Sequence, residues 1–467
     1  MHKQIVSFLP SQFDTPLSTR ALTTTTSPFE LICSDVVICF RKLGYFMGIM
    51  VPLTPYGSGA LDEFYPSVQN LWAMFVHALL VFVELAFLLS VPFFVFFIGI
   101  GCMVYSAIVA LIIYVLCLRL NGRTSGPTMS DPSILEGYDK KEDEVWIFVN
   151  GIAVGDHWHQ SNLNRLSLSF RRPIIGIHNP TYGIIFDTIQ CLIQRDFSYN
   201  TADVRETYTY LKASLLDPSV KKVVLIAHSQ GGIIASMALD WLYADLPSSS
   251  LRLLEVYTFG NAANHFNNPS RSSPSVGDRQ DDSEGGPVNA NINNESFLAK
   301  STKAFLSSPI TGRQEYDERV VPHIEHYANS GDFISQIGVL EFTKSFKHRN
   351  HRFLGRVFEQ IGVRGHQFNQ HYMDTMFPID RHTGLVLDHN TFMDAECTVD
   401  ENLVVSRERT ASDAVGQAVG NGDDHGTKDL KEEYVSATKA NVDRVKSMQI
   451  CALSRLWLYT NGKVPTD

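Results

Sequence analysis

The sequence predicts an α/β protein with a mostly parallel sheet, preceded by two membrane-inserted helices. Three observations support this prediction. Short apolar stretches of strand type alternate with helical patterns over residues 143–395, which is typical of a parallel sheet covered by helices on both faces. One serine lies between such a strand and a glycine-rich helix start. Upstream, the 48 residues from Leu71 to Leu118 contain one formally charged residue, Glu84.

The composition excludes some classes of protein. The chain has 467 residues, and its 39 Lys+Arg against 49 Asp+Glu give a formal net charge of −10. An acidic chain without a basic cluster lacks the electrostatic footprint of a nucleic-acid-binding protein, so we expect no nucleic-acid partner. The seven cysteines are scattered, with no CxxC pair and no zinc-type spacing. They indicate a reducing compartment rather than a disulfide scaffold.

The apolar block is too long for one membrane span. As a single helix it would measure about 72 Å, more than twice a hydrocarbon core of about 30 Å. Pro92 favours a break near the middle, so we expect helices over Leu71–Ser90 and Phe94–Leu118. Basic residues on both flanks place both ends in the cytosol, and the hairpin could cross twice or dip into one leaflet. A buried core hairpin is the alternative.

Two ionisable residues inside the block, His77 and Glu84, lie seven positions apart and so share one helical face. Ionisable groups in lipid are commonly functional, although these two could simply pair.

Composition divides the rest of the chain. Residues 119–142 contain the Gly-, Pro- and Ser-rich stretch Ser125–Gly137 and are expected to be a linker. Residues 264–296 are polar and almost without large apolar side chains, which predicts a disordered insertion within the domain. The expected parts are therefore an N-terminal region (1–70), the membrane segment (71–118), the linker (119–142), the α/β domain (143–395) and a polar tail (396–467) with one helix over Lys428–Leu458.

Within the α/β domain, five strands and three helices are expected. The strands are Glu144–Val149, Pro173–His178, Lys222–Ala227, Leu253–Phe259 and His323–Ala328. The helices are Tyr182–Arg195, Thr201–Leu216 and Gly232–Tyr243.

The third strand runs into Ala227-His228-Ser229-Gln230-Gly231-Gly232. A serine at a sharp strand-to-helix turn has its hydroxyl exposed and the next amide aimed at the same place, and only small neighbours tolerate that backbone. A loose match of this kind arises by chance, but here a β-branched strand and an apolar helix flank it in the required order. Ser229 is therefore the candidate nucleophile.

A serine hydroxyl needs a histidine base and an acid that orients it, and at such a turn these follow later in the chain, acid first. Asp332 follows the expected strand His323–Ala328 in a turn, although an ordinary Asx-turn is the alternative. Asp374 and Asp380 come too late for that order. His366, after Gly365, is the candidate base, and His371 is its rival.

The oxyanion of an acyl-transfer intermediate needs two donors. We expect them to be the backbone amides of Gln230 and Ile152, with Asn150 as a possible aid. His157 and His159 could indicate a metal, but a substrate-facing loop is the preferred interpretation, so no metal site is expected.

The segments IFVNGI, HSQGG, TFGNAANHF, YANSGDFIS and GHQFNQHY resemble the α/β-hydrolase superfamily, most closely its fungal lipase-like or serine-esterase members with an N-terminal membrane segment. The resemblance covers residues 143–390. It implies an α/β-hydrolase fold and a triad of Ser229, Asp332 and His366. Two departures, Ala227 at the first elbow glycine and Asn150 where a His-Gly pair is frequent, weaken any statement about the substrate.

We therefore expect a membrane-anchored serine esterase whose substrate is an ester, by position that of a lipid, and whose partners are that substrate and the bilayer. No cofactor is expected. The site is expected on an endomembrane such as the endoplasmic reticulum or a lipid droplet, with the catalytic domain in the cytosol. The alternatives are an inactive membrane scaffold of the same fold, or an acyltransferase, thioesterase or peptidase with the same triad.

Overall fold

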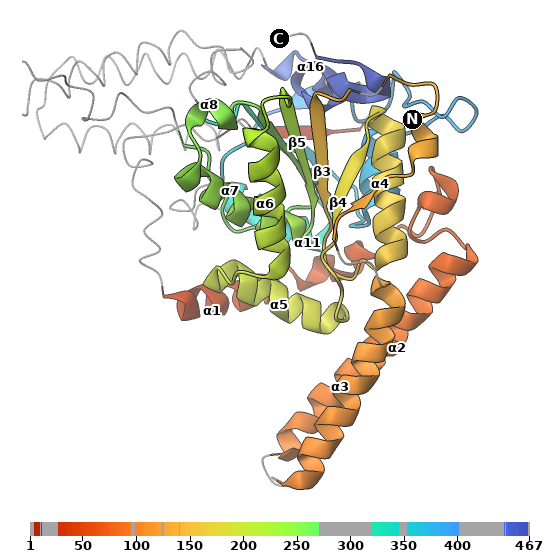
Figure 1. The fold of residues 1–467 in the computed structure, drawn as a ribbon, viewed down its shortest axis with the longest axis vertical. Coiled ribbons are helices and arrows are strands. Elements are labelled where there is room, and N and C mark those ends of the chain that lie inside the picture. Colours follow the sequence, from red (N-terminus) through yellow and green to blue (C-terminus); the bar gives the residue numbers. More distant parts are fainter. Residues whose placement is uncertain are drawn as a thin grey trace, which may run out of the picture.

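The computed structural model has a nine-stranded mixed sheet in the order β2-β4-β3-β5-β6-β7-β8-β1-β9 (Figure 1). It describes residues 4–9, 11, 27–94, 99–122, 126–139, 141–269, 319–344, 353–400, 443 and 445–465. The strands are β1 (Val6–Leu9), β2 (Thr128–Met129), β3 (Glu144–Val149), β4 (Ile174–Ile177), β5 (Lys222–His228), β6 (Leu254–Phe259), β7 (His323–Asn329), β8 (Arg356–Gln360) and β9 (Cys397–Thr398).

The six central strands, β4-β3-β5-β6-β7-β8, are all parallel. The α/β class with a mostly parallel sheet is therefore confirmed, and five of these strands lie where the sequence predicts them. In the register of β3 and β5, Val149 is opposite Ala227, so the two strands end side by side. The carboxyl ends of all six reach one edge of the sheet, where the loops that follow them gather.

The main helices are α1 (Pro28–Arg41), α2 (Val68–Phe94), α3 (Ile100–Asn121), α4 (Asp156–Phe170), α5 (Ile184–Phe197), α6 (Ala202–Leu216) and α7 (Gly231–Asp245). Shorter ones are α8 (Ser248–Leu251), α11 (Phe333–Ile337), α12 (Val339–Lys344), α13 (Asp374–Met376) and α16 (Ile450–Leu453), the 3₁₀-helices η1 (Leu43–Ile49), η2 (Gly59–Leu61), η3 (Pro132–Leu135) and η6 (Leu456–Gly462), and the π-helix η5 (Phe368–Met373).

The sheet separates two apolar cores, because successive side chains along a strand point to opposite faces. Val223 and Leu225 of β5 face a core completed by α6 and α7. Val224 and Ile226 face the other core, which α4 and the C-terminal elements complete. Both faces of the sheet are covered, which is why the central strands have near-continuous apolar sequences.

The first residues of the chain belong to the sheet, which the sequence did not lead us to expect. β1 lies between β8 and β9, antiparallel to β8 and parallel to β9. Phe8 is fully buried there and packs on Phe358 with ring centroids 5.3 Å apart. Four residues are too short a pattern to stand out in a sequence, and their pairing partners lie some 350 positions away.

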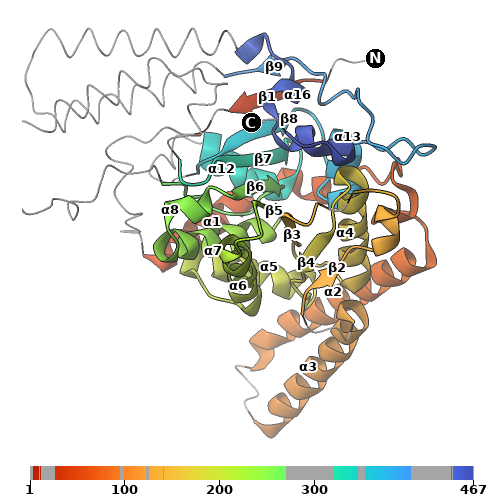
Figure 2. The same cartoon turned by 45° about the horizontal axis from the view of Figure 1, so that its top comes forward.

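The end of the chain also differs from the polar tail that we expected. Ile450, Leu453, Leu456 and Tyr459 are buried against the sheet (Figure 2). Arg455 N donates to Glu325 Oε1 at 2.8 Å, which ties this segment to β7. Most of the helix predicted at Lys428–Leu458 lies outside the described residues, as does most of the insertion predicted at 264–296.

The apolar block forms two antiparallel helices, α2 and α3, that project from the domain (Figure 1). Both are long and apolar enough to cross a membrane. The predicted break at Pro92 is wrong by a few residues. Pro92 lies in the last turn of α2, which ends two residues later at Phe94.

His77 and Glu84 do not pair with each other. The His77 ring stacks on Trp158 of α4, with centroids 5.3 Å apart and planes at 9°. Glu84 Oε2 accepts a hydrogen bond from Ile185 N at the start of α5, at 3.1 Å. Both side chains therefore join the hairpin to the α/β domain.

The C-terminal packing gives a stability prediction. Leu456→Ala removes a fully buried side chain from the second core and should lower the free energy of unfolding by about 2–5 kcal/mol. Leu458→Ala, two residues on and 43 % exposed, is the control and should change it by less than about 1 kcal/mol. Urea unfolding in detergent measures both. Equal effects would contradict the placement of this segment in the core.

Candidate active site

Ser229 lies at a sharp turn between β5, which ends at His228, and α7, which begins at Gly231. Its backbone φ of +58° is in the left-handed region, which costs a non-glycine residue about 1 kcal/mol or more. Hydrogen bonds on both sides hold the turn. Ser229 N donates to Phe259 O at 3.0 Å, and Ser229 O accepts from Gly232 N at 3.0 Å. A strained, over-determined serine of this kind is a feature of functional sites.

Two positions around this serine must be glycine, because neighbouring atoms lie where a Cβ atom would be. A Cβ on Gly151 would lie 2.4 Å from Ser229 Cβ, and one on Gly231 would lie 2.4 Å from the carbonyl oxygen of Val149. Real Cβ atoms do not come this near. The loop after β3 and the first turn of α7 therefore reach the serine only because neither has a side chain at these positions.

His366 lies between the serine and an aspartate. Its Nε2 is 2.9 Å from Ser229 Oγ, and its Nδ1 is 2.8 Å from Asp332 Oδ2. An aspartate at Nδ1 favours the tautomer with the proton on that nitrogen, which leaves Nε2 free to accept the serine proton. The structure thus brings together Ser229, His366 and Asp332, in the order and contacts of a catalytic triad.

Asp332 is fully buried and held by several donors. Besides His366, it accepts hydrogen bonds from the Tyr372 hydroxyl at 2.7 Å, Ser335 Oγ at 2.9 Å and Ile334 N at 2.9 Å. Burial acts to raise the pKa of Asp332, but His366 and these hydrogen bonds outweigh it and lower the pKa below its usual value. Asp332 therefore stays ionised, as the orienting group of a histidine must.

His371, the rival base, does not reach the serine. Its Nδ1 accepts from Gln367 N at 2.9 Å, so its Nε2 carries the proton and donates to Pro52 O at 2.7 Å. Burial lowers the pKa of His371, which keeps the ring neutral. This histidine holds the N-terminal segment against the loop that carries His366.

The sequence reasoning did not single out two residues beside the triad, His228 and Tyr372. The His228 ring lies against that of His366, with centroids 4.7 Å apart, and its Nε2 donates to the His366 carbonyl at 2.8 Å. Burial, reinforced by His366, holds the pKa of His228 well below its usual value, so no second cation forms there. Both residues stand inside the motifs already noted, but only the fold shows which way they face.

The two amides expected to hold an oxyanion belong to residues next to the serine turn in the chain or in the fold. Gln230 caps α7, and a helix leaves its first N–H groups without intrahelical partners. Ile152 follows Gly151 in the turn that touches Ser229. The Asn150 side chain does not aid them directly. Its amide nitrogen donates to Gly151 O and Asn179 O, both at 3.0 Å, and so fixes the shape of the loop.

Side-chain amides continue behind the Gln230 backbone. Asn179 Nδ2 donates to Gln230 Oε1 at 2.6 Å, and Gln230 Nε2 donates to Gln194 Oε1 of α5 at 2.7 Å. The orientation of Gln230 is therefore determined by the loop after β4 and by helix α5 as well as by its own helix.

The remaining candidates lie elsewhere. His157 and His159 are in the first turn of α4, not in a substrate-facing loop. His157 Nε2 is 3.0 Å from Asn70 Oδ1, and His159 is fully buried. Asp374 accepts from Ser58 Oγ at 2.5 Å and pairs with Arg165 Nη2 at 3.6 Å, so it is engaged outside the triad. Asp380 caps an exposed turn through His382 N, at 2.7 Å.

The triad is closed to solvent by the N-terminal segment. Ser229 is 2 % exposed and His366 7 %. Gly365 N donates to Gly48 O at 2.7 Å and His366 N to Ile49 O at 3.2 Å, so η1 lies directly on the histidine loop. A substrate reaches Ser229 only if this cover moves or leaves a passage beside it.

In comparisons with known proteins, no family model matches the chain, and no curated protein matches it.

The lowered pKa of Asp332 predicts a pH dependence of stability. Because its folded-state pKa lies below the unfolded value of about 3.9, its ionisation stabilises the fold fully above about pH 4, and this contribution is lost as pH falls through the folded pKa. Asp332→Asn should therefore be destabilised by a constant amount from pH 7 to 5, and the difference from wild type should shrink below pH 4.

Urea titrations across this range measure the difference. The control is Asp388→Asn, whose carboxylate is 75 % exposed and which should stay near wild type throughout. A difference between Asp332→Asn and wild type that persists unchanged to pH 3 would contradict the assigned ionisation.

Proposed function

We propose that this protein is a serine hydrolase of the α/β-hydrolase superfamily that cleaves an ester through Ser229, His366 and Asp332. The observation that carries the proposal is the pair of contacts at His366, 2.9 Å to the serine hydroxyl and 2.8 Å to the aspartate. The positive φ of Ser229 between a strand and a helix supports it further. So does the chain order serine, aspartate, histidine, which is the order of that superfamily.

The chemistry follows from the positions of the atoms. Ser229 Oγ attacks the acyl carbonyl while His366 Nε2 takes its proton, and Asp332 stabilises the imidazolium that forms. The amides of Gln230 and Ile152 are the proposed donors to the oxyanion, and one such donor is worth about 3–4 kcal/mol. His366 then protonates the departing alcohol, and a water activated by the same nitrogen releases the acid.

A lipid ester is the proposed substrate class. The carboxyl edge of the sheet, where Ser229 lies, is covered by α5 and η1, and α5 packs on the apolar hairpin α2–α3. A site held beside membrane helices meets acyl chains at high local concentration. The proposed location is an endomembrane, with the α/β domain in the cytosol.

The serine is tested by its removal. Ser229→Ala leaves binding and the oxyanion donors in place but removes the nucleophile, so kcat for a p-nitrophenyl ester should fall by roughly 10⁴- to 10⁶-fold. Stopped-flow release of p-nitrophenol by the full chain in detergent should also lose its burst phase. Ser236→Ala, buried in α7, the helix that follows Ser229, is the matched control and should keep its burst. Wild-type protein with no ester turnover and no burst would contradict the proposal.

The two histidines give a second comparison. His366→Ala should lower kcat about as far as Ser229→Ala, because triad members act as a unit. His371→Ala removes the hydrogen bonds with Gln367 N and Pro52 O, neither of which involves Ser229, and should cost far less, with its loss seen mainly in thermal stability. Rates and melting temperatures of both variants decide the point. If His371→Ala lost catalysis and His366→Ala kept it, the base would be His371 and the assignment to His366 would be wrong.

A further inference from the structure

Helix α5 has its polar and apolar faces the opposite way round from an ordinary surface helix. Its three charged residues, Asp187, Arg195 and Asp196, are all buried. Its outward positions are occupied by Ile189, Ile193 and similar residues, and Thr188 is the one polar residue among the exposed positions of this fully described helix. A helix in contact with water places charges outward. The charged face of α5 needs polar partners inside the protein, and its apolar outer face needs an apolar environment.

The polar interior is the carboxyl edge of the sheet. Arg195 Nη1 donates to Ala262 O at 2.8 Å and to Ile337 O at 2.9 Å, so it satisfies carbonyls of the loops after β6 and within α11. Its Nε donates to Asp35 Oδ2 of α1 at 2.7 Å, inside the protein. Asp187 is likewise held inside, accepting from Thr181 Oγ1 at 2.6 Å and from Tyr182 N at 2.7 Å. The exposed apolar face of α5 has no such partners among the described residues.

The exposed apolar surface continues over α1, which packs beside α5 at one end of the domain (Figures 1 and 2), and over η1, which contacts α1. Phe40, Phe46 and Met47 are 73 %, 53 % and 67 % exposed. Arg41, next to them, pairs with Glu341 Oε1 at 3.2 Å. We call the exposed apolar side chains of α1, η1 and α5 the docking face. Apolar surface of this extent on a single face marks a binding site.

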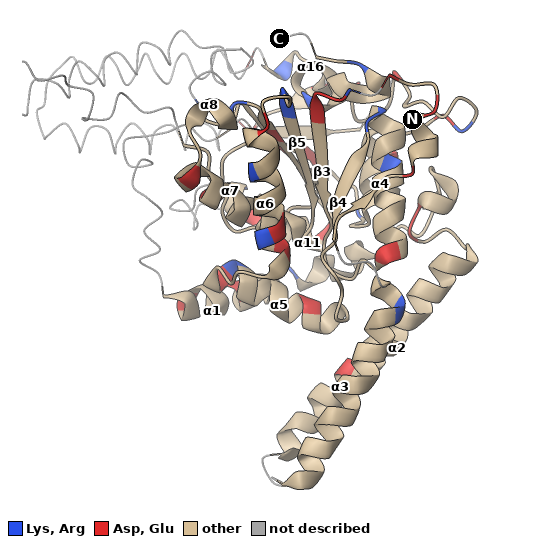
Figure 3. Ribbon diagram, in the orientation of Figure 1, with Lys and Arg blue, Asp and Glu red and all other residues tan. Residues whose placement is uncertain are grey.

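The docking face is continuous with the membrane hairpin. Phe87 of α2 contacts Phe186 of α5, with ring centroids 6.4 Å apart, close to where Glu84 binds Ile185 N. Figure 3 shows that the hairpin below this level has no charged residue. The part of the hairpin next to the docking face is therefore uncharged, as a surface in contact with lipid must be.

The length of hairpin beyond this contact is short. From Phe87 to the end of α2 at Phe94 there are seven residues, and at 1.5 Å per residue they extend roughly 10 Å. The hydrocarbon core is about 30 Å thick. If α5 lies at the membrane surface, the tip reaches about the middle of the bilayer. Crossing would require the domain itself, with its charged residues, to enter the hydrocarbon.

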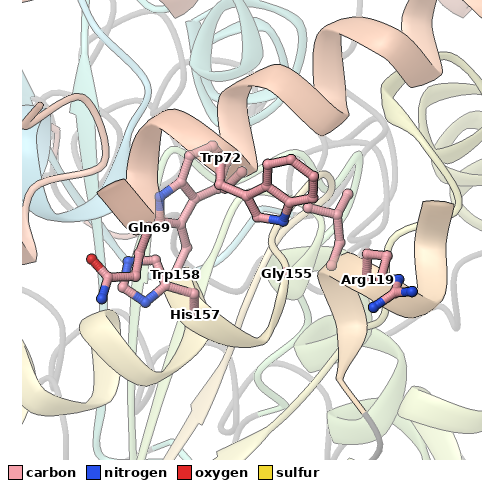
Figure 4. Close-up of a pocket in the computed structure, with 8 residues that line it drawn as sticks. Gln69, Trp72, Arg119, Gly155, His157 and Trp158 are labelled. Atoms are coloured by element: carbon pink, nitrogen blue, oxygen red, sulfur yellow. The ribbon is translucent and has the colours of Figure 1, made fainter. Parts of the chain in front are cut away.

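The other end of the hairpin packs against the α/β domain. A small pocket of about 150 Å³ between α2, α3 and α4 is lined by Trp72, Trp158, Arg119 and His157 (Figure 4). Trp72 is 54 % exposed. Trp72 lies about 22 Å along α2 from Phe87, on the domain side of the Glu84 contact, so this end of the hairpin stays outside the hydrocarbon when α5 lies at the membrane surface.

We propose that the docking face lies in the surface of a phospholipid bilayer, and that the hairpin enters the same leaflet without crossing it. Insertion of apolar side chains drives this binding, since the net charge of −10 gives no general attraction to anionic lipid. If the proposed function holds, the carboxyl edge with Ser229 faces the bilayer, and an ester lipid enters from the leaflet below η1. The docking itself does not depend on catalysis.

The test uses the full chain in phosphatidylcholine vesicles, with a single environment-sensitive nitrobenzoxadiazole (NBD) label on an engineered cysteine. The seven native cysteines are replaced by serine or alanine, and melting curves confirm the fold of each variant. The positions are Ile193→Cys on the docking face, Gly99→Cys at the hairpin tip and Leu216→Cys as control. Leu216 is 53 % exposed at the far end of α6, so it is an apolar position outside the proposed contact. Ile189→Cys replaces Ile193→Cys if that variant does not fold.

Lipids brominated at shallow or deep acyl positions report depth. The label at 193 should be quenched by shallow bromines at least twofold more than the label at 216, with or without anionic lipid. The label at 99 should be quenched most by deep bromines and stay protected from dithionite. A label at 193 reduced by dithionite as fast as that at 216 would overturn the docking face. A label at 99 quenched by shallow bromines of the far leaflet would overturn the single-leaflet hairpin. Neither result depends on whether Ser229→Ala is inactive.

Discussion

The left-handed backbone of Ser229 is the constraint on which the rest of the site depends. It turns the chain from β5 into α7 within two residues, and the turn closes only because Gly151 and Gly231 allow neighbouring backbone to approach. The parallel pairing of β3 with β5 brings that backbone there, and the further strands place Asp332 and His366 at the same edge. The strain is held by the sheet, so the serine is positioned before any substrate arrives.

The same edge explains the unusual cover above it. Loops at the carboxyl ends of parallel strands leave carbonyls that need donors, and Arg195 of α5 supplies two of them from inside the protein. A helix whose charged groups are used inward has mainly apolar groups left for its outer face, with Thr188 the polar exception among the exposed positions of α5. The buried triad is thus linked to the inverted polarity of α5. Because α5 turns its charges inward to close the site, the domain is left with an exposed apolar surface next to the apolar hairpin.

The sequence predicted those parts of the fold whose pattern is local. β3 and β5 are long apolar strands bounded by turn residues, and the elbow around Ser229 carries its own glycines, so all three were evident. β1 was not, because four residues gain meaning only by pairing with β8, far along the chain. His366 could be preferred to His371 only on its chain spacing and the preceding Gly365, whereas its contacts arise from tertiary packing. The docking face was missed because the apolar periodicity of α5 is the same whether its apolar face is buried or exposed, and the sequence alone does not say which face is inside.

The central claim is that Ser229 is a nucleophile activated by its neighbours, and its direct test is the site of covalent reaction. Purified full-length protein is treated with a fluorophosphonate, digested and mapped by tandem mass spectrometry. The account predicts one adduct, on the peptide containing Ser229, formed rapidly by wild type and not by His366→Ala. An unmodified Ser229 in folded wild-type protein, or an adduct on another serine at the same rate, would contradict it.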